Sequence, residues 1–133
     1  MKQYMLDTDT SSYIIRSRPE SVLARFSRLD SNRLCISVIT EAELQYGVRL
    51  ASGAAGIRAD VEDFLRRLSI LDWDRAAAAH YADIRVQLES SGKSIGNMDL
   101  MIAAHARSAG STLVTNNEKH FRRVPRLLVE NWA

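Results

Sequence analysis

Residues 34–50 read LCISVITEAELQYGVRL, and this stretch decides the fold class. The run LCISVI at 34–39 is apolar enough for a strand that is buried on both faces of a sheet. Thr40 follows directly and is expected to open a helix that runs to about Leu50. A buried strand that passes straight into a helix is the repeating unit of parallel α/β folds.

The same alternation of strand and helix patterns extends outward in both directions. Further strands are expected at residues 2–7, 70–73, 111–115 and 127–129, and helices at 10–17, 19–29, 61–68, 75–90 and 97–108. Every connection between strands except the last is long enough for a crossover helix, which favours parallel pairing. We therefore predict an α/β fold of three layers, in which a central, mainly parallel sheet of four to five strands is flanked by helices.

Length and composition exclude several classes of protein. The chain has 133 residues, of which 46% are hydrophobic and 26% charged, so we expect one soluble domain over 1–133. Cys35 is the only cysteine, which excludes an internal disulfide and a cysteine zinc cluster. No apolar stretch approaches the roughly 18 residues of a membrane span, and Asp7 stands where a signal peptide is apolar. We expect a cytoplasmic protein without membrane association.

The net charge of +2 is too small to indicate a nucleic-acid partner by itself. Fifteen of the 18 basic residues are arginines, which bind phosphate in a bidentate manner that lysine cannot reproduce. Four basic residues gather around His120 near the C-terminus: Lys119, Arg122, Arg123 and Arg126. A basic cluster beside an acidic site is typical of proteins that bind nucleic acid.

Four polar residues follow the predicted strands at the positions where ligands bind in parallel sheets. Asp7 closes the first strand, Glu43 lies in the helix after the second, Asp99 begins the helix at 97–108, and Asn117 follows the strand at 111–115. The carboxyl ends of parallel strands share one edge of the sheet, so all four can meet there. Carboxylates that converge in this way repel one another unless they share protons or hold a cation. Oxygen donors without cysteine suit Mg²⁺ or Mn²⁺, which points to phosphodiester chemistry.

Each of these residues also has a purely structural interpretation. Asp7 and Asp99 could each stabilise the N-terminus of a helix, and Asn117 could be a turn residue. Glu43 has the sharpest alternative, because Thr40 and Glu43 match the spacing of a capping box. The metal-site hypothesis therefore depends on the set and not on any one member.

Four segments resemble the PIN-domain ribonucleases, and more narrowly the VapC toxins of bacterial type II toxin–antitoxin pairs. They are MLDTD (5–9), ISVITEAELQYG (36–47), GNMDLMIAAHA (96–106) and LVTNNEKHF (113–121). The resemblance runs from Met1 to Trp132, with the motifs in the order and spacing of the family. It implies the three-layer PIN fold and agrees with the α/β prediction.

The resemblance also implies roles for individual residues. Asp7, Glu43 and Asp99 match the three acidic positions of the PIN active site, and Asn117 matches the fourth, which is Asp in many members. Asp9 and Thr115 match positions beside the metal ligands. The Asn at the fourth position implies a weaker ligand there.

For function, the resemblance implies a metal-dependent endoribonuclease that cleaves RNA, often a structured RNA such as tRNA, with water activated by Mg²⁺. It implies a VapB-like antitoxin as partner, a homodimer, and a hetero-oligomer with the antitoxin. The basic residues Lys119, Arg122, Arg123 and Arg126 become the expected RNA-phosphate surface.

Other functional classes remain open at this point. Asp7-Thr8-Asp9 also resembles the first motif of haloacid-dehalogenase-like phosphatases, although the later lysine and acidic pair of that family are missing. A receiver-like module would need an acid after the third strand, where Asp72 and Asp74 lie, but it lacks the remaining acidic pair. A third alternative is a PIN-like module that binds RNA without cutting it.

Overall fold

A parallel sheet forms the centre of the computed structural model, which describes residues 2–51 and 55–133. Within these residues the sheet has five strands: β1 (Tyr4–Leu6), β2 (Leu34–Ser37), β3 (Ser69–Leu71), β4 (Thr112–Val114) and β5 (Val129–Glu130). Their order across the sheet is β3-β2-β1-β4-β5, and every neighbouring pair is parallel. The prediction of a mainly parallel sheet is confirmed, and β1 lies at its centre.

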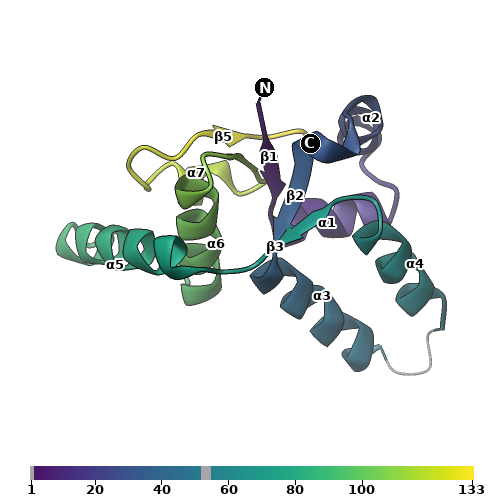
Figure 1. Cartoon of the computed structure of the whole chain (residues 1–133), viewed down its shortest axis with the longest axis horizontal. Helices are drawn as coiled ribbons and strands as arrows, with labels where there is room; N and C mark the ends of the chain where they lie inside the picture. Colours follow the sequence, from purple (N-terminus) through teal and green to yellow (C-terminus); the bar gives the residue numbers. More distant parts are fainter. Residues whose placement is uncertain (1, 52–54) are drawn as a thin grey trace.

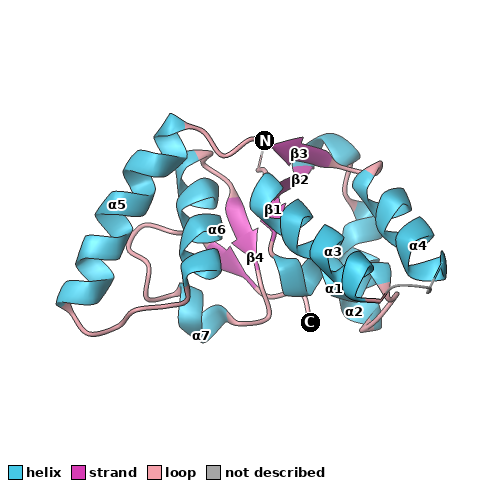
Figure 2. Cartoon of the chain, turned by 90° about the horizontal axis from the view of Figure 1, so that it is seen from below, coloured by secondary structure: helices cyan, strands magenta, loops and turns pink. Residues whose placement is uncertain are grey.

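Helices cover both faces of this sheet. They are α1 (Thr8–Ile15), α2 (Glu20–Arg28), α3 (Val38–Leu50), α4 (Ala55–Leu65), α5 (Arg75–Ser90), α6 (Asn97–Ser108) and the short α7 (Glu118–Phe121), with a 3-10 turn at Ser31–Arg33. Helices α5 and α6 lie on one side of the strands and α1 to α4 on the other (Figures 1 and 2). The predicted three-layer arrangement is therefore confirmed.

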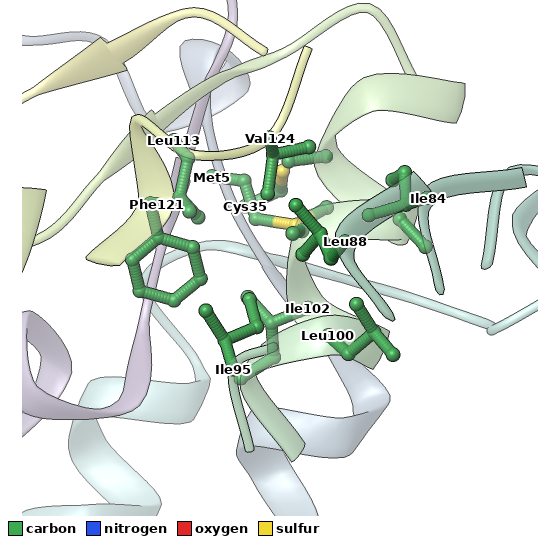
Figure 3. Close-up of a cluster of buried hydrophobic side chains, with 13 residues drawn as sticks. Met5, Cys35, Ile84, Leu88, Ile95, Leu100, Ile102, Leu113, Phe121 and Val124 are labelled. Carbon is green, nitrogen blue, oxygen red and sulfur yellow. The ribbon is translucent and has the colours of Figure 1, made fainter. Parts of the chain in front are cut away.

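Two hydrophobic clusters hold the layers together, one on each face of the sheet. Alternate side chains of a strand point to opposite faces, so Met5 joins one cluster while Tyr4 and Leu6 join the other. The first cluster packs the sheet against α5 and α6 and includes Cys35 and Phe121 (Figure 3). Cys35 is buried, as expected for a residue within the apolar run at 34–39.

The boundary between β2 and α3 differs from the prediction. The strand ends at Ser37, and the Ser37 hydroxyl accepts a hydrogen bond of 3.1 Å from the backbone N–H of Ile39. Ser37 is therefore the N-cap, and the helix begins at Val38 instead of Thr40. The apolar pair at 38–39 was wrongly assigned to the strand because apolarity alone does not distinguish a buried strand from a buried first turn of helix.

The helix expected at 61–68 needs the largest correction, because α4 spans Ala55–Leu65. The helix expected at 10–17 begins two residues earlier, at Thr8, and the strand expected at 70–73 lies at Ser69–Leu71. Asp74 is the N-cap of α5, and its carboxylate accepts a 3.0 Å hydrogen bond from the N–H of Ala77. In the stretches that the structure describes, no helix combines the length and the apolar composition needed to cross a membrane.

Candidate active site

Asp7 lies where the central strand β1 ends and α1 begins. Its side chain is only 4% exposed, and one carboxylate oxygen accepts a 2.8 Å hydrogen bond from the N–H of Thr10. It thus caps α1, a role the sequence offered as the alternative to metal binding. Burial raises the pKa of Asp7 from 3.8 to about 6, although hydrogen bonds from Thr115 and Thr10 oppose the shift. A buried carboxyl whose charged form is so poorly compensated is typical of functional sites.

Glu43 reaches the same region from α3. The hydroxyl of Thr8, the residue after Asp7, donates a short hydrogen bond to Glu43 Oε1, and the Thr40 hydroxyl lies 3.3 Å from that of Thr8. The capping-box interpretation of Glu43 is wrong, because Ser37 is the N-cap and Thr40 lies inside the helix. Glu43 is therefore tied to the segment that carries Asp7, and not to the start of its own helix.

Asp99 lies in the first turn of α6 and faces His120. Its carboxylate is 3.4 Å from the Nδ1 atom of His120. Burial raises the pKa of Asp99, the negative charge of Asp9 raises it further, and His120 opposes both effects. Asp9 also raises the pKa of Asp7, so its charge acts on both carboxylates.

Asn117 connects the two halves of the site. Its backbone N–H donates a 2.9 Å hydrogen bond to the hydroxyl of Thr115, which in turn hydrogen-bonds Asp7. The amide nitrogen of its side chain lies 2.9 Å from Nδ1 of His120, the residue beside Asp99. A chain of contacts thus runs from Asp7 through Asn117 to Asp99, and all four predicted site residues lie at one edge of the sheet.

The carboxylates do not form a closed set of ligands around one point. Among the residues that the structure describes, no three Asp, Glu, His or Cys side chains are arranged to hold a metal ion. Each carboxylate contacts a different partner instead. Asp7 accepts a hydrogen bond at the start of α1, Glu43 accepts one from Thr8, and Asp99 lies beside His120. Mg²⁺ needs only one or two carboxylates, because it keeps several of its waters. The donors present, all hard oxygens, fit that cation.

The predicted RNA-binding residues are less freely available than the sequence suggested. Three of the four interact within the protein: Arg122 with Glu118 at 3.0 Å, Arg126 with Asp83 at 3.5 Å, and Arg123 with the Ser94 carbonyl at 3.3 Å. Lys119 is exposed. The cluster is therefore partly neutralised, and its role in binding RNA stays a prediction.

Two residues of the site were not among the predicted ones. Thr8 directly follows the strand end, which puts its hydroxyl beside the acids of the site. His120 was predicted only as part of the basic cluster near the C-terminus. His120 lies three residues after Asn117, at the start of a helical turn. Residues at this spacing share one face of a helix, so the spacing is the feature of the sequence that could have predicted their contact.

Comparison with known proteins agrees with this geometry. A family model described as PIN domain matches residues 4–127. The chain belongs to the PIN domain family. This PIN domain is 46% identical over 133 residues to Ribonuclease VapC2 of Haemophilus influenzae, and 42% identical to the tRNA(fMet)-specific endonuclease VapC of Salmonella typhimurium. Both alignments cover 100% of each chain.

Solved structures place the PIN domain in the VapC branch of the family. VapBC of Salmonella typhimurium bound to DNA superposes with a TM-score of 0.92 at 42% identity, covering 100% of both chains. VapBC2 of Rickettsia felis bound to promoter DNA gives a TM-score of 0.91 at 41% identity over 98% of each chain. The resemblance to VapC toxins is confirmed over the whole chain.

Proposed function

We propose that this chain is the endoribonuclease toxin of a VapBC-type toxin–antitoxin pair, and that it hydrolyses phosphodiester bonds in RNA with Mg²⁺, or Mn²⁺ in its place. The observation that carries the proposal is the connected set of oxygen donors at the carboxyl edge of the sheet. Asp7, Thr115, Asn117, His120 and Asp99 form one chain of contacts, which Glu43 joins through Thr8.

Asp7, Asp99 and Glu43 are the residues that would hold the metal. Bound there, Mg²⁺ supplies an activated water and stabilises the charge that develops on the phosphate. Asp7 is pre-positioned by its bond to α1, and its pKa of about 6 shows that its charge lacks compensation within the protein. Asn117 contributes a neutral side-chain oxygen, and its amide nitrogen contacts Nδ1 of His120. Asp9 adds negative charge beside the two aspartates.

For the substrate, we propose a structured RNA, with tRNA as the first choice. Two relatives that share 41–42% identity over the full chain carry the name tRNA(fMet)-specific endonuclease. RNA must approach the edge of the sheet where α6 and α7 begin, and Lys119 and Arg123 lie on or just after α7. These two side chains are the first candidates for phosphate contacts.

The antitoxin has a suitable groove beside the site. A groove of about 490 Å³ runs between α1, α3 and α4. Its lining includes the apolar Ile15, Leu44, Val48 and Val61, two acidic residues, Asp9 and Asp60, and one basic residue, Arg16. An apolar floor with acidic groups fits an antitoxin segment that carries apolar and basic side chains. Because Asp9 belongs to both the groove and the active site, a segment bound there would obstruct the site. We also propose that the toxin is a homodimer, as well as a hetero-oligomer with its antitoxin.

The rival functions receive less support. The phosphatase hypothesis, with Asp7 as nucleophile and Asp9 as general acid, lacks the later lysine and acidic pair of that family, and the chain matches the PIN family model instead. The receiver hypothesis lacks the remaining acidic pair, and of its two candidate acids after β3, Asp74 caps α5. A PIN-like module that binds RNA without cutting it shares the whole site geometry, so only an assay separates it from the nuclease.

The test is incubation of the purified protein with total RNA in Mg²⁺, in Mn²⁺ and in excess EDTA. We expect defined cleavage products with either cation and none with EDTA, with activity restored when Mg²⁺ is added back. Cleavage that continues undiminished in EDTA would exclude the metal mechanism. Binding of RNA without cleavage under every condition would favour the non-catalytic module.

A further inference from the structure

Thr8 follows Asp7 in the chain and contacts Glu43 through its hydroxyl. The comparisons with known proteins give Thr8 no role. It is the first residue of α1 and is half-buried, and its hydroxyl contacts side chains of α3 only. One contact is the hydrogen bond to Glu43 Oε1, and the other is the Thr40 hydroxyl at 3.3 Å. Thr40 and Glu43 are three residues apart, so they share one face of the helix.

The direction of these hydrogen bonds follows from the available protons. A carboxylate can only accept, and a threonine hydroxyl has a single proton to donate. The proton of Thr8 therefore goes to Glu43, and Thr40 must donate its own proton to the oxygen of Thr8. Thr40 is fully buried, and its hydroxyl has no other side-chain partner in the described part of the chain. The result is a directed relay from Thr40 through Thr8 to Glu43.

This relay fixes a side chain that is otherwise free to move. Glutamate loses conformational entropy when it is held in one rotamer, so a fixed orientation needs a partner that holds it. The hydroxyl that holds Glu43 Oε1 is itself held by its contact with the fully buried Thr40. Within the described residues Glu43 Oε2 makes no hydrogen bond, which leaves that oxygen available to a ligand.

We infer that Thr8, supported by Thr40, is a positioning residue that orients the Glu43 carboxylate toward the cation beside Asp7. The inference rests on the proposed function, because Glu43 needs a fixed orientation only if it serves the metal site. Residues that hold metal ligands in place typically contribute 10- to 100-fold to metal affinity or activity.

The test compares Thr8→Val, which keeps the shape and removes the hydroxyl, with Thr8→Ser, which keeps the hydroxyl. For Thr8→Val we expect Mn²⁺ affinity, measured by calorimetry on the RNA-free protein, to fall at least about tenfold, and RNA cleavage to fall with it. Thr8→Ser should stay within about threefold of wild type, since the conservative variant restores the donor. Thr40→Val should give a smaller loss in the same direction.

The matched control is Thr112→Val, which removes the hydroxyl of another buried threonine at the opposite end of β4. It should leave Mn²⁺ affinity and cleavage unchanged. The double variant Thr8→Val with Glu43→Gln should lose no more Mn²⁺ affinity than Glu43→Gln alone, because Thr8 acts only through Glu43. Additive losses would overturn the inference, as would a Thr8→Val protein that binds Mn²⁺ like wild type.

A structural measurement separates this inference from the proposed function. Crystal structures of metal-free wild type and Thr8→Val should show Glu43 ordered in the first and displaced or disordered in the second. Glu43 unchanged in both would overturn the positioning role, even in an active enzyme. A wild type that neither binds Mn²⁺ nor cleaves RNA would overturn the proposed function, while the crystal structures still decide whether Thr8 orients Glu43.

Discussion

Asp7 is the N-cap of α1 and, in the proposed function, also a ligand of the metal. As the N-cap of α1 it accepts a hydrogen bond from Thr10, which an asparagine could also do. Its burial, however, raises the pKa from 3.8 to about 6, so the folded protein carries a charge that the fold alone does not stabilise. The sequence predicted that Asp7 is a site residue, but only the structure shows that it also caps the helix.

Because the ionised Asp7 carboxylate is buried at a cost to the fold, we expect Asp7→Asn to stabilise the metal-free protein at neutral pH. The raised pKa means that ionised Asp7 opposes folding above about pH 6, by up to about 3 kcal/mol at 1.36 kcal/mol per pKa unit. The opposition fades as the pH falls from about 6 to about 4, below which the carboxyl is protonated in both states. Urea unfolding in EDTA should therefore show a clearly larger gain at pH 7.5 than at pH 4.5. A variant less stable than wild type at pH 7.5 would contradict this.

The substitution Glu43→Gln removes the negative charge of this side chain and keeps its size and shape. The Gln side-chain oxygen can still accept the hydrogen bond from Thr8, so we expect unfolding in EDTA to match that of wild type within roughly 1 kcal/mol. Cleavage of RNA in Mg²⁺ should fall at least about 100-fold, because the negative charge that supports the metal is lost. Cleavage at the wild-type rate by the folded variant would remove Glu43 from the site.

At the scale of elements, the sequence predicted which segments are strands and helices better than where they begin. Helix α6 is found at its predicted bounds, Asn97–Ser108, because Gly110 gives a clear stop and adopts the left-handed φ of +68°. The start of α3 was misplaced because Ser37 and Thr40 are both good caps, and only tertiary packing selects between them. In the structure, His105 of α6 lies 2.7 Å from the Ser37 hydroxyl.

That contact between α6 and α3 predicts a pH dependence of stability. His105 is 3% exposed, and burial lowers its pKa below the ordinary 6.5. A histidine with a lowered pKa must be neutral in the fold, so its contribution is present above pH 6.5 and is lost as the pH falls below that value. We expect His105→Gln to lose less stability than wild type between pH 7 and pH 5, measured by urea unfolding. Parallel losses in the two proteins would show that His105 is not responsible.

At the scale of the whole molecule, the alternation of strands and helices was sufficient to predict the three-layer fold and the edge that carries the site. Asp7, Glu43, Asp99 and Asn117 were predicted to meet because parallel strands end at one edge, and the structure brings them there. Thr8 and His120 could not be predicted with the same certainty, since their roles depend on side-chain directions that spacing does not define.

The proposed toxin activity predicts a phenotype in bacterial cells. Expression of the chain without an antitoxin should arrest bacterial growth, and Asp7→Asn should relieve the arrest while circular dichroism shows an intact fold. Co-expression of the cognate antitoxin should relieve the arrest of the wild type. Growth arrest that persists with a folded Asp7→Asn protein would show that toxicity does not depend on this site.

The most direct test of the central claim is the rate of tRNA cleavage under single-turnover conditions in Mg²⁺, measured for wild type, Asp7→Asn and Asp99→Asn. Both substitutions keep side-chain size and remove a charge from the edge of the sheet. If the connected oxygen donors form a metal-dependent nuclease centre, each variant should stay folded and lose at least about 100-fold in rate. Folded variants that cleave tRNA at the wild-type rate would contradict the assignment of the active site.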